Sequence, residues 1–164
     1  MIFQSTKNDL KFNWDFYRSE FLKAGSSTHS WSKNSGAFFQ DHFELVFSRV
    51  LLELNAGTMQ LWVSCDQQHR DIFYYLCLTH LQTDPFTKQK TLLIFALVRS
   101  EEVEEEKIDQ LWTEAFREIS KFASINNCSG LTAFTDLDHM VKKAKSLSDK
   151  IIKRDFIYFP LEDT

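Results

Sequence analysis

The chain has 164 residues, of which 43% are hydrophobic and 15% aromatic, with 16 Phe but only 4 Gly and 2 Pro. This length suits one domain with a sizeable core, and the composition excludes a disordered or fibrous protein. The net charge of −4 at pH 7 excludes a general attraction to nucleic-acid backbones. Since no signal-peptide pattern and no membrane-span window is present, we expect a single domain over 1–164 in the cytoplasm.

The first segments of the chain predict one strand and one helix. Residues 2–6 favour a short strand, and Asp9 is the predicted cap of a helix over 10–23 that Gly25 ends. The apolar residues of this helix that we expect in the core include Phe12, Phe16 and Leu22.

Residues 25–36, GSSTHSWSKNSG, contain five Ser and no aliphatic residue. This composition predicts an exposed, mobile loop. His29 and Trp31 stand out in it, and Trp31 either contacts a partner or folds back on its own domain.

A second helix and three strands are predicted next. Residues 38–54 carry apolar side chains at helical spacing. Residues 59–65 alternate between apolar and other side chains, residues 72–81 are rich in aromatics, and residues 91–98 are apolar throughout. The last pattern is typical of a central strand covered on both faces. The short connections predict an antiparallel meander.

The remaining segments predict a long helix over 101–124, a strand over 131–135, a helix capped by Asp136 and a strand over 151–159. The apolar stripe of the long helix comprises Ile108, Leu111, Trp112, Ala115, Phe116, Ile119 and Ala123. The predicted fold class is therefore α/β of the α+β kind, with a mixed, mostly antiparallel sheet flanked by helices.

This order of elements, β-α-α-β-β-β-α-β-α-β, resembles the GNAT superfamily of N-acetyltransferases. The opening FQSTKNDL, the apolar strand that runs into a long helix, and the closing LTAFTD and IIKRDFIYFPLE carry the likeness. It implies a site for acyl-CoA, whose pyrophosphate binds backbone N–H groups at the start of the long helix. The family motif there is Gln or Arg, two residues, Gly, one residue, then Gly or Ala.

The matching segment 99–110, RSEEVEEEKIDQ, departs from this motif because it has no glycine. It carries five carboxylates within six residues, namely Glu101, Glu102, Glu104, Glu105 and Glu106. At surface dielectric, a like charge at ~4 Å costs roughly 4 kcal/mol before screening. We therefore expect the acids to repel a pyrophosphate, and we predict a degenerate active site with no cofactor.

Signals for other chemistry are absent. Many family members have a Tyr in the last helix as general acid, but residues 136–147 contain none, and His139 is interpreted as solvated or capping. The histidines and the three cysteines lack metal-ligand spacing, and Cys65, Cys77 and Cys128 are interpreted as reduced core thiols. No catalytic, cofactor or metal residue is predicted.

The charge pattern suggests surfaces for partners. Acids gather at Glu101, Glu102, Glu104 and Glu105, and bases gather at Lys142, Lys143 and Lys145. Two solvated helix faces are one interpretation; docking on other proteins or further copies of the chain is the other.

The leading hypothesis is a non-enzymatic GNAT-like domain that binds proteins. The likeness to internal virion proteins of tailed bacteriophages makes a virion component our first choice. The alternative is an acyl-CoA-dependent N-acyltransferase with a divergent cofactor site that uses the backbone of strand 91–98. A second alternative is a nucleic-acid-associated packaging factor, although the basic segment lacks interleaved aromatics to stack bases.

Overall fold

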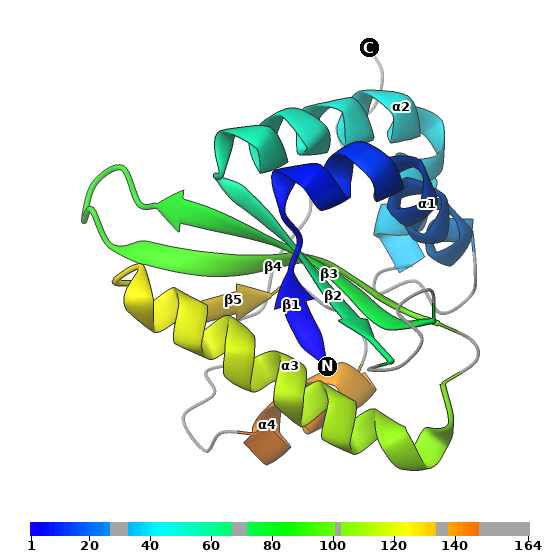
Figure 1. Cartoon of the computed structure of the whole chain (residues 1–164). Coiled ribbons are helices and arrows are strands. Elements are labelled where there is room, and N and C mark those ends of the chain that lie inside the picture. The colour runs from blue at the N-terminus through cyan, green and yellow to red at the C-terminus, as the bar shows by residue number, and fades with distance from the viewer. Residues whose placement is uncertain (27–32, 67–71, 101–102, 134–137, 148–164) are drawn as a thin grey trace.

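The computed structural model describes residues 1–26, 33–66, 72–100, 103–133 and 138–147. Along the chain the elements are β1 (Ile2–Gln4), α1 (Lys7–Ser26), α2 (Lys33–Ala56), β2 (Met59–Cys65), β3 (Phe73–Thr83), β4 (Lys90–Arg99), α3 (Glu105–Ile125), β5 (Leu131–Ala133) and α4 (Asp138–Leu147) (Figure 1). This order confirms the predicted one as far as α4. The predicted strand over 151–159 and the predicted cap Asp136 lie outside the described residues.

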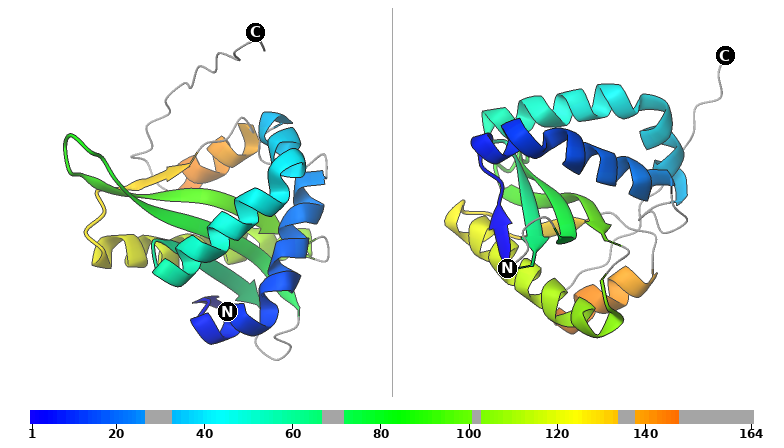
Figure 2. Two further views of the ribbon diagram at one scale, coloured as in Figure 1. Left: turned by 90° about the horizontal axis from the view of Figure 1, so that it is seen from above. Right: turned by 45° about the vertical axis from the view of Figure 1, so that its right-hand side comes forward.

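The strands form one five-stranded sheet in the order β1-β2-β3-β4-β5. Neighbouring strands are antiparallel except β4 and β5, which run parallel. A parallel pair needs a crossover connection, and α3 supplies it. Helices α1 and α2 cover one face of the sheet, and α3 and α4 lie on the other side (Figure 2). The mixed, mostly antiparallel sheet flanked by helices is the predicted fold class.

The core under α1 and α2 confirms the predicted stripe of α2, since Phe43, Phe47, Val50 and Leu54 are all buried. The strand residues on this face include Leu61, Val63, Leu76, Leu78 and Val98.

The predicted buried face of α1 is wrong. Phe12 is 77% exposed, Phe16 43% and Leu22 40%. The residues that pack inward lie on another stripe of the same helix, at Leu10, Tyr17 and Phe21. Both stripes contain aromatic residues at helical spacing, so the sequence alone does not show which one is buried. The contact with α2 and the sheet determines it.

The start of α1 also differs from the prediction. The cap is Thr6, whose Oγ1 accepts a hydrogen bond from the backbone N–H of Asp9 at 3.2 Å. The helix begins at Lys7 and extends one residue past Gly25, to Ser26, and α2 begins at Lys33. Helices therefore occupy both ends of the predicted loop 25–36, and residues 27–32 lie outside the described part.

Strand β2 matches its predicted bounds, but all seven of its residues are buried. The alternation in the sequence predicts that one face of this strand is exposed to solvent. In the structure Gln60, Trp62 and Ser64, which lie on that face, are buried because α3 covers them. None of the described helices is both long and apolar enough to cross a membrane.

Candidate functional site

The candidate site lies where β4 enters α3. In the described residues β5 pairs with β4 over Leu92–Ile94, whereas β4 continues to Arg99. Just past this pairing, Leu78 of β3 pairs with Ala96 and Thr79 with Ile94, so Phe95 is an extra residue in β4. Such a bulge bends its strand and increases the local twist. The bulge therefore redirects β4 as it leaves β5 and approaches α3.

Helix α3 begins without a side-chain cap. Its N-cap residue Glu104 is extended, at φ −61° and ψ 133°, and makes no capping hydrogen bond through its side chain. The first N–H groups of a helix have no intrahelical partner, and the helix dipole concentrates positive potential there. Phosphates and carboxylates bind such ends in many proteins. The backbone at this point thus favours an anion.

The side chains around this helix start carry both signs. Glu104 is exposed and its carboxylate lies 2.9 Å from Lys107 Nζ. The hydrogen bond to Glu104 is the main cause that raises the pKa of Lys107, with the charge of Glu104 adding to it. The prediction that the helix starts at residue 101 is wrong: α3 starts at Glu105, and one of the acids before it is ion-paired.

A second polar pair lies beside the helix start. Tyr74 Oη donates a hydrogen bond to Asp66 Oδ2 at 2.8 Å, and this bond, with burial, raises the pKa of Tyr74. The backbone N–H of Ser100, directly after β4, donates to the Tyr74 carbonyl at 3.0 Å. These contacts join the ends of β2 and β3 to the β4–α3 connection. The sequence prediction missed this pair, although a polar residue at the end of one strand and a Tyr at the start of the next was a usable signal.

The face of the sheet under α3 has a small apolar cavity of about 20 Å³. Its wall includes Trp62, Tyr75, Cys77, Leu97 and Trp112. Trp112 Nε1 is buried and has no hydrogen-bond partner among the described residues. A cavity of this volume holds about one water molecule, so it gives no room for an acyl group.

The predicted partner-binding residues are only partly described. His29, Trp31, Glu101 and Glu102 lie outside the described residues. Glu105 is the first residue of α3, and Lys143 lies in α4 between the exposed residues Lys142 and Lys145. Within the described ranges, no group of three His, Cys, Asp or Glu could hold a metal ion.

Comparison with known proteins identifies the fold. No protein-family model matches the sequence, and no curated protein does. An aminoglycoside acetyltransferase, meta-AAC0020 from an uncultured soil metagenomic sample, in complex with sisomicin, superposes with a TM-score of 0.65 at 12% identity, over 99% of this chain and 96% of that one.

Two further solved structures agree. A GNAT family acetyltransferase from Staphylococcus aureus gives a TM-score of 0.62 at 10% identity, over 99% of this chain and 98% of that one. A point mutant of the BH1408 protein from Bacillus halodurans gives 0.66 at 13% identity, over 99% of both chains. At such identities the likeness establishes the fold, which is GNAT-like, as the order of elements predicted.

Proposed function

We propose that this domain is an N-acyltransferase that takes an acyl group from an acyl-CoA thioester, such as acetyl-CoA, and passes it to an amine. The observation that carries the proposal is the uncapped start of α3 at the end of β4, in a chain with the acetyltransferase fold along its length. The N–H of Lys107 donates to the Glu104 carbonyl, but no side chain caps the helix, so the N–H groups before Lys107 can bind a pyrophosphate.

The side chains near this point fit such a donor in part. Arg99 is exposed at the end of β4, and Lys107 lies in the first turn of α3. Arg99 would attract phosphates, whereas Glu106 is exposed in the same turn as Lys107 and would repel them. The pairing of Glu104 with Lys107 weakens the repulsion that the sequence predicts, but does not remove it. We therefore expect the donor to bind more weakly than in an enzyme with a glycine-rich turn.

Acyl transfer also needs proton transfers at this end of the sheet. The amine loses a proton as its nitrogen attacks the thioester carbonyl carbon, and the C–S bond breaks to release a thiolate that takes up a proton. Asp66 and Tyr74 are our candidates for these steps, because they form a hydrogen-bonded acid and hydroxyl beside the β4–α3 connection. A tyrosine hydroxyl is protonated at neutral pH, and the raised pKa of Tyr74 extends this to higher pH.

Thermal unfolding with and without acetyl-CoA tests the proposal. A ligand at 100 times its dissociation constant adds about 2.7 kcal/mol of stability, which raises the melting temperature by several degrees. Arg99→Glu should remove this rise. Glu106→Gln is the matched control at the same helix start and should enlarge it. Asp66→Asn should lower the rate of labelled acetyl transfer to a panel of amines. It should still show the increase in melting temperature with acetyl-CoA.

A non-enzymatic interaction domain, in the form of a phage virion component, is the second candidate. It is supported by the glycine-free segment 99–107 with its five glutamates. It predicts no thermal rise with acetyl-CoA for the wild-type chain or Glu106→Gln, and no acetyl transfer. That result would overturn the first proposal, and portal or tail genes beside the coding sequence would then support the virion role.

A further inference from the structure

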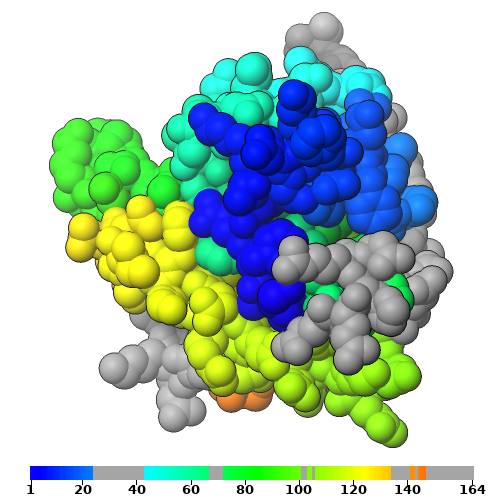
Figure 3. Space-filling view, in the orientation of Figure 1, coloured from blue at the N-terminus to red at the C-terminus, as the bar shows by residue number. Residues whose placement is uncertain are grey.

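The hairpin that joins β3 to β4 projects from the body of the molecule (Figures 1 and 3). All residues from Gln82 to Lys90 are exposed. Phe86, at its tip, is 91% exposed, more than any other large hydrophobic residue among those described. Single exposed hydrophobic side chains are common on protein surfaces, but an aromatic one at the end of a projecting element is fully accessible to a partner.

The tip is held rigidly. Asp84 Oδ1 accepts hydrogen bonds from the backbone N–H groups of Phe86 at 2.9 Å and Thr87 at 2.6 Å, and from Thr87 Oγ1 at 3.0 Å. The N–H of Lys88 donates to the Asp84 carbonyl at 3.0 Å, and Lys88 adopts a φ of 59°. The left-handed conformation is disfavoured for a residue with a side chain, so the hydrogen bonds to Asp84 must hold it in place. Because the backbone of the tip is ordered in this way, binding would cost mainly the side-chain freedom of Phe86.

The tip also carries a net positive charge, from two lysines beside one aspartate. Lys88 and Lys90 are exposed, and neither pairs with an acid in the part of the chain that the structure describes. The hydrogen bonds from Thr87 and Phe86 lower the pKa of Asp84, so its carboxylate stays charged and offsets one of the two lysines. A matching surface would offer Phe86 an apolar contact and carry a net negative charge.

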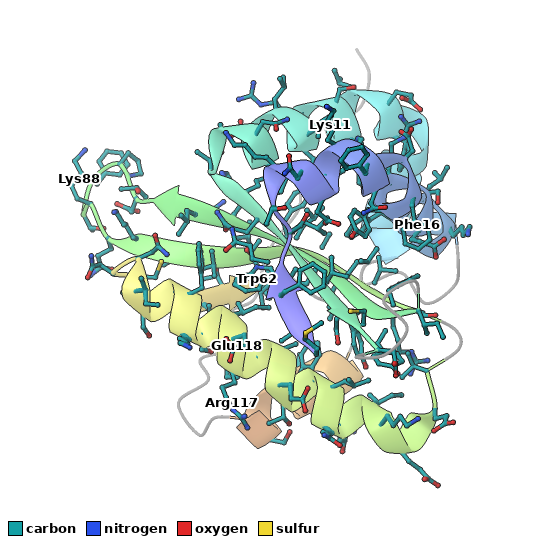
Figure 4. The ribbon with its side chains drawn as sticks, in the orientation of Figure 1. Lys11, Phe16, Trp62, Lys88, Arg117 and Glu118 are labelled. Carbon is teal, nitrogen blue, oxygen red and sulfur yellow. The ribbon has the colours of Figure 1, made fainter. Side chains whose placement is uncertain are left out.

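A groove on the chain itself has one partly buried apolar residue and a net negative charge, from two glutamates against one arginine. Ile2 of β1 and Glu114, Arg117 and Glu118 of α3 line an open groove of about 330 Å³. Strand β1 and helix α3 lie side by side on the face seen in Figure 3, away from the hairpin, and Figure 4 labels Lys88 at the tip and Arg117 and Glu118 on α3. Glu114 accepts a hydrogen bond from Gln110, and neither glutamate forms an ion pair within the described ranges.

We propose that the hairpin tip of one copy docks in the β1–α3 groove of a second copy, with Phe86 against Ile2 and Lys88 or Lys90 against Glu114 and Glu118. The contact joins two different surfaces, so it is head-to-tail: in a dimer one copy keeps an unused groove and the other an unused tip. Its small size places it among weak, transient interfaces, with a dissociation constant on the order of 0.1 mM. This inference does not depend on the proposed enzymatic function.

Sedimentation equilibrium over about 10 µM to about 1 mM tests the contact. The mass-average molecular weight of the wild-type chain should rise with concentration and should rise less at high salt. Phe86→Ser and Glu118→Lys should each stay monomeric. Phe12→Ser is the matched control, because Phe12 is also highly exposed, at 77%, and has Lys11 over its ring at 5.7 Å. It should associate like the wild type.

Mixing the two monomeric variants makes the test decisive. Phe86→Ser retains the groove and Glu118→Lys retains the tip, so an equimolar mixture should form a dimer of one copy of each and grow no further. Combining Lys88→Glu with Glu118→Lys in one chain should restore association. A wild-type chain that stays monomeric, a mixture that stays monomeric, or undiminished association of Glu118→Lys would each overturn the proposal. Circular dichroism melts confirm that every variant is folded.

Discussion

The two faces of the sheet are filled in different ways. Under α1 and α2 one continuous cluster of aromatic and aliphatic side chains is buried, with Phe47 in ring contact with Trp14, Phe21 and Phe43. Under α3 the core is divided into two smaller clusters, and it contains a cavity and an indole N–H without a partner among the described residues. The first face is a close-packed core, whereas the second tolerates polar groups and a void.

A buried polar chain marks the difference most clearly. Trp62 Nε1 donates to Thr79 Oγ1 at 2.9 Å, Thr79 Oγ1 donates to Gln60 Oε1 at 3.0 Å, and Gln60 Nε2 donates to the Gly57 carbonyl at 3.0 Å. All three side chains face α3, the helix whose start forms the candidate site. Stability is therefore expected to come mainly from the α1 and α2 face, and three substitutions probe the contrast.

The largest effect is expected for Phe47→Ala. This residue is 2% exposed and packs against three other aromatic rings, so its loss should lower the free energy of unfolding by about 3–5 kcal/mol. Urea unfolding followed by circular dichroism measures it. Phe12→Ala, at a 77% exposed position of α1, should change stability by less than about 0.5 kcal/mol. Equal losses for the two variants would contradict the packing described.

A pH effect on the α3 face is expected next. Burial raises the pKa of the Cys77 thiol from 9.0 to about 12. The folded state keeps the thiol neutral. The contribution of Cys77 to the free energy of unfolding is therefore complete below the pKa of 9.0 in the unfolded chain, and it is lost as the pH rises from there to about 12. The loss is about 1.4 kcal/mol per pH unit and reaches about 4 kcal/mol by pH 12.

Urea unfolding between pH 9 and pH 10 measures this contribution as the difference between the wild type and Cys77→Ala, because the buried thiol of Cys65 is common to both and tyrosines of the unfolded chain ionise mostly above that range. Cys77→Ala should flatten the fall in stability with pH there, whatever it does to stability at pH 7. Cys128, which is only partly buried, provides the matched Cys128→Ala control and should leave the slope unchanged. An unchanged slope in Cys77→Ala would count against burial of the ionisable thiol.

The smallest effect is expected for Thr79→Val. Valine has nearly the same shape but leaves the Trp62 N–H and the Gln60 oxygen buried without their partner, which should cost about 1–3 kcal/mol. Thr83→Val, at the exposed end of the same strand, serves as the control and should be near neutral. If Thr79→Val were as stable as the wild type, the polar chain would have no role in stability.

Much of the fold could be predicted from the sequence because its patterns were unambiguous. The bounds of β2, the apolar run of β4 and the stripe of α3 each follow one period, and the structure places them as expected. α1 could not be predicted in this way: Phe12 and Phe16 compete with Tyr17 and Phe21 for the core, and only the position of α2 selects between them.

The candidate site was harder to predict for a related reason. The sequence shows the number of acids in segment 99–107 directly. How strongly they repel a phosphate depends on where α3 begins and on the ion pair between Glu104 and Lys107. The Asp66–Tyr74 hydrogen bond likewise depends on the β2–β3 register, which brings the ends of those strands together. Sequence gives residue types, whereas these contacts are tertiary.

The order of strands in the sheet has a consequence for how the chain folds. The pairings of β2 with β3 and β3 with β4 join neighbours along the chain, whereas Ile2 must find Ser64 and Leu131 must find Leu92. Closing long loops costs more entropy and slows pairing. The central meander can therefore nucleate by itself, and the two outer strands dock onto a template that already exists.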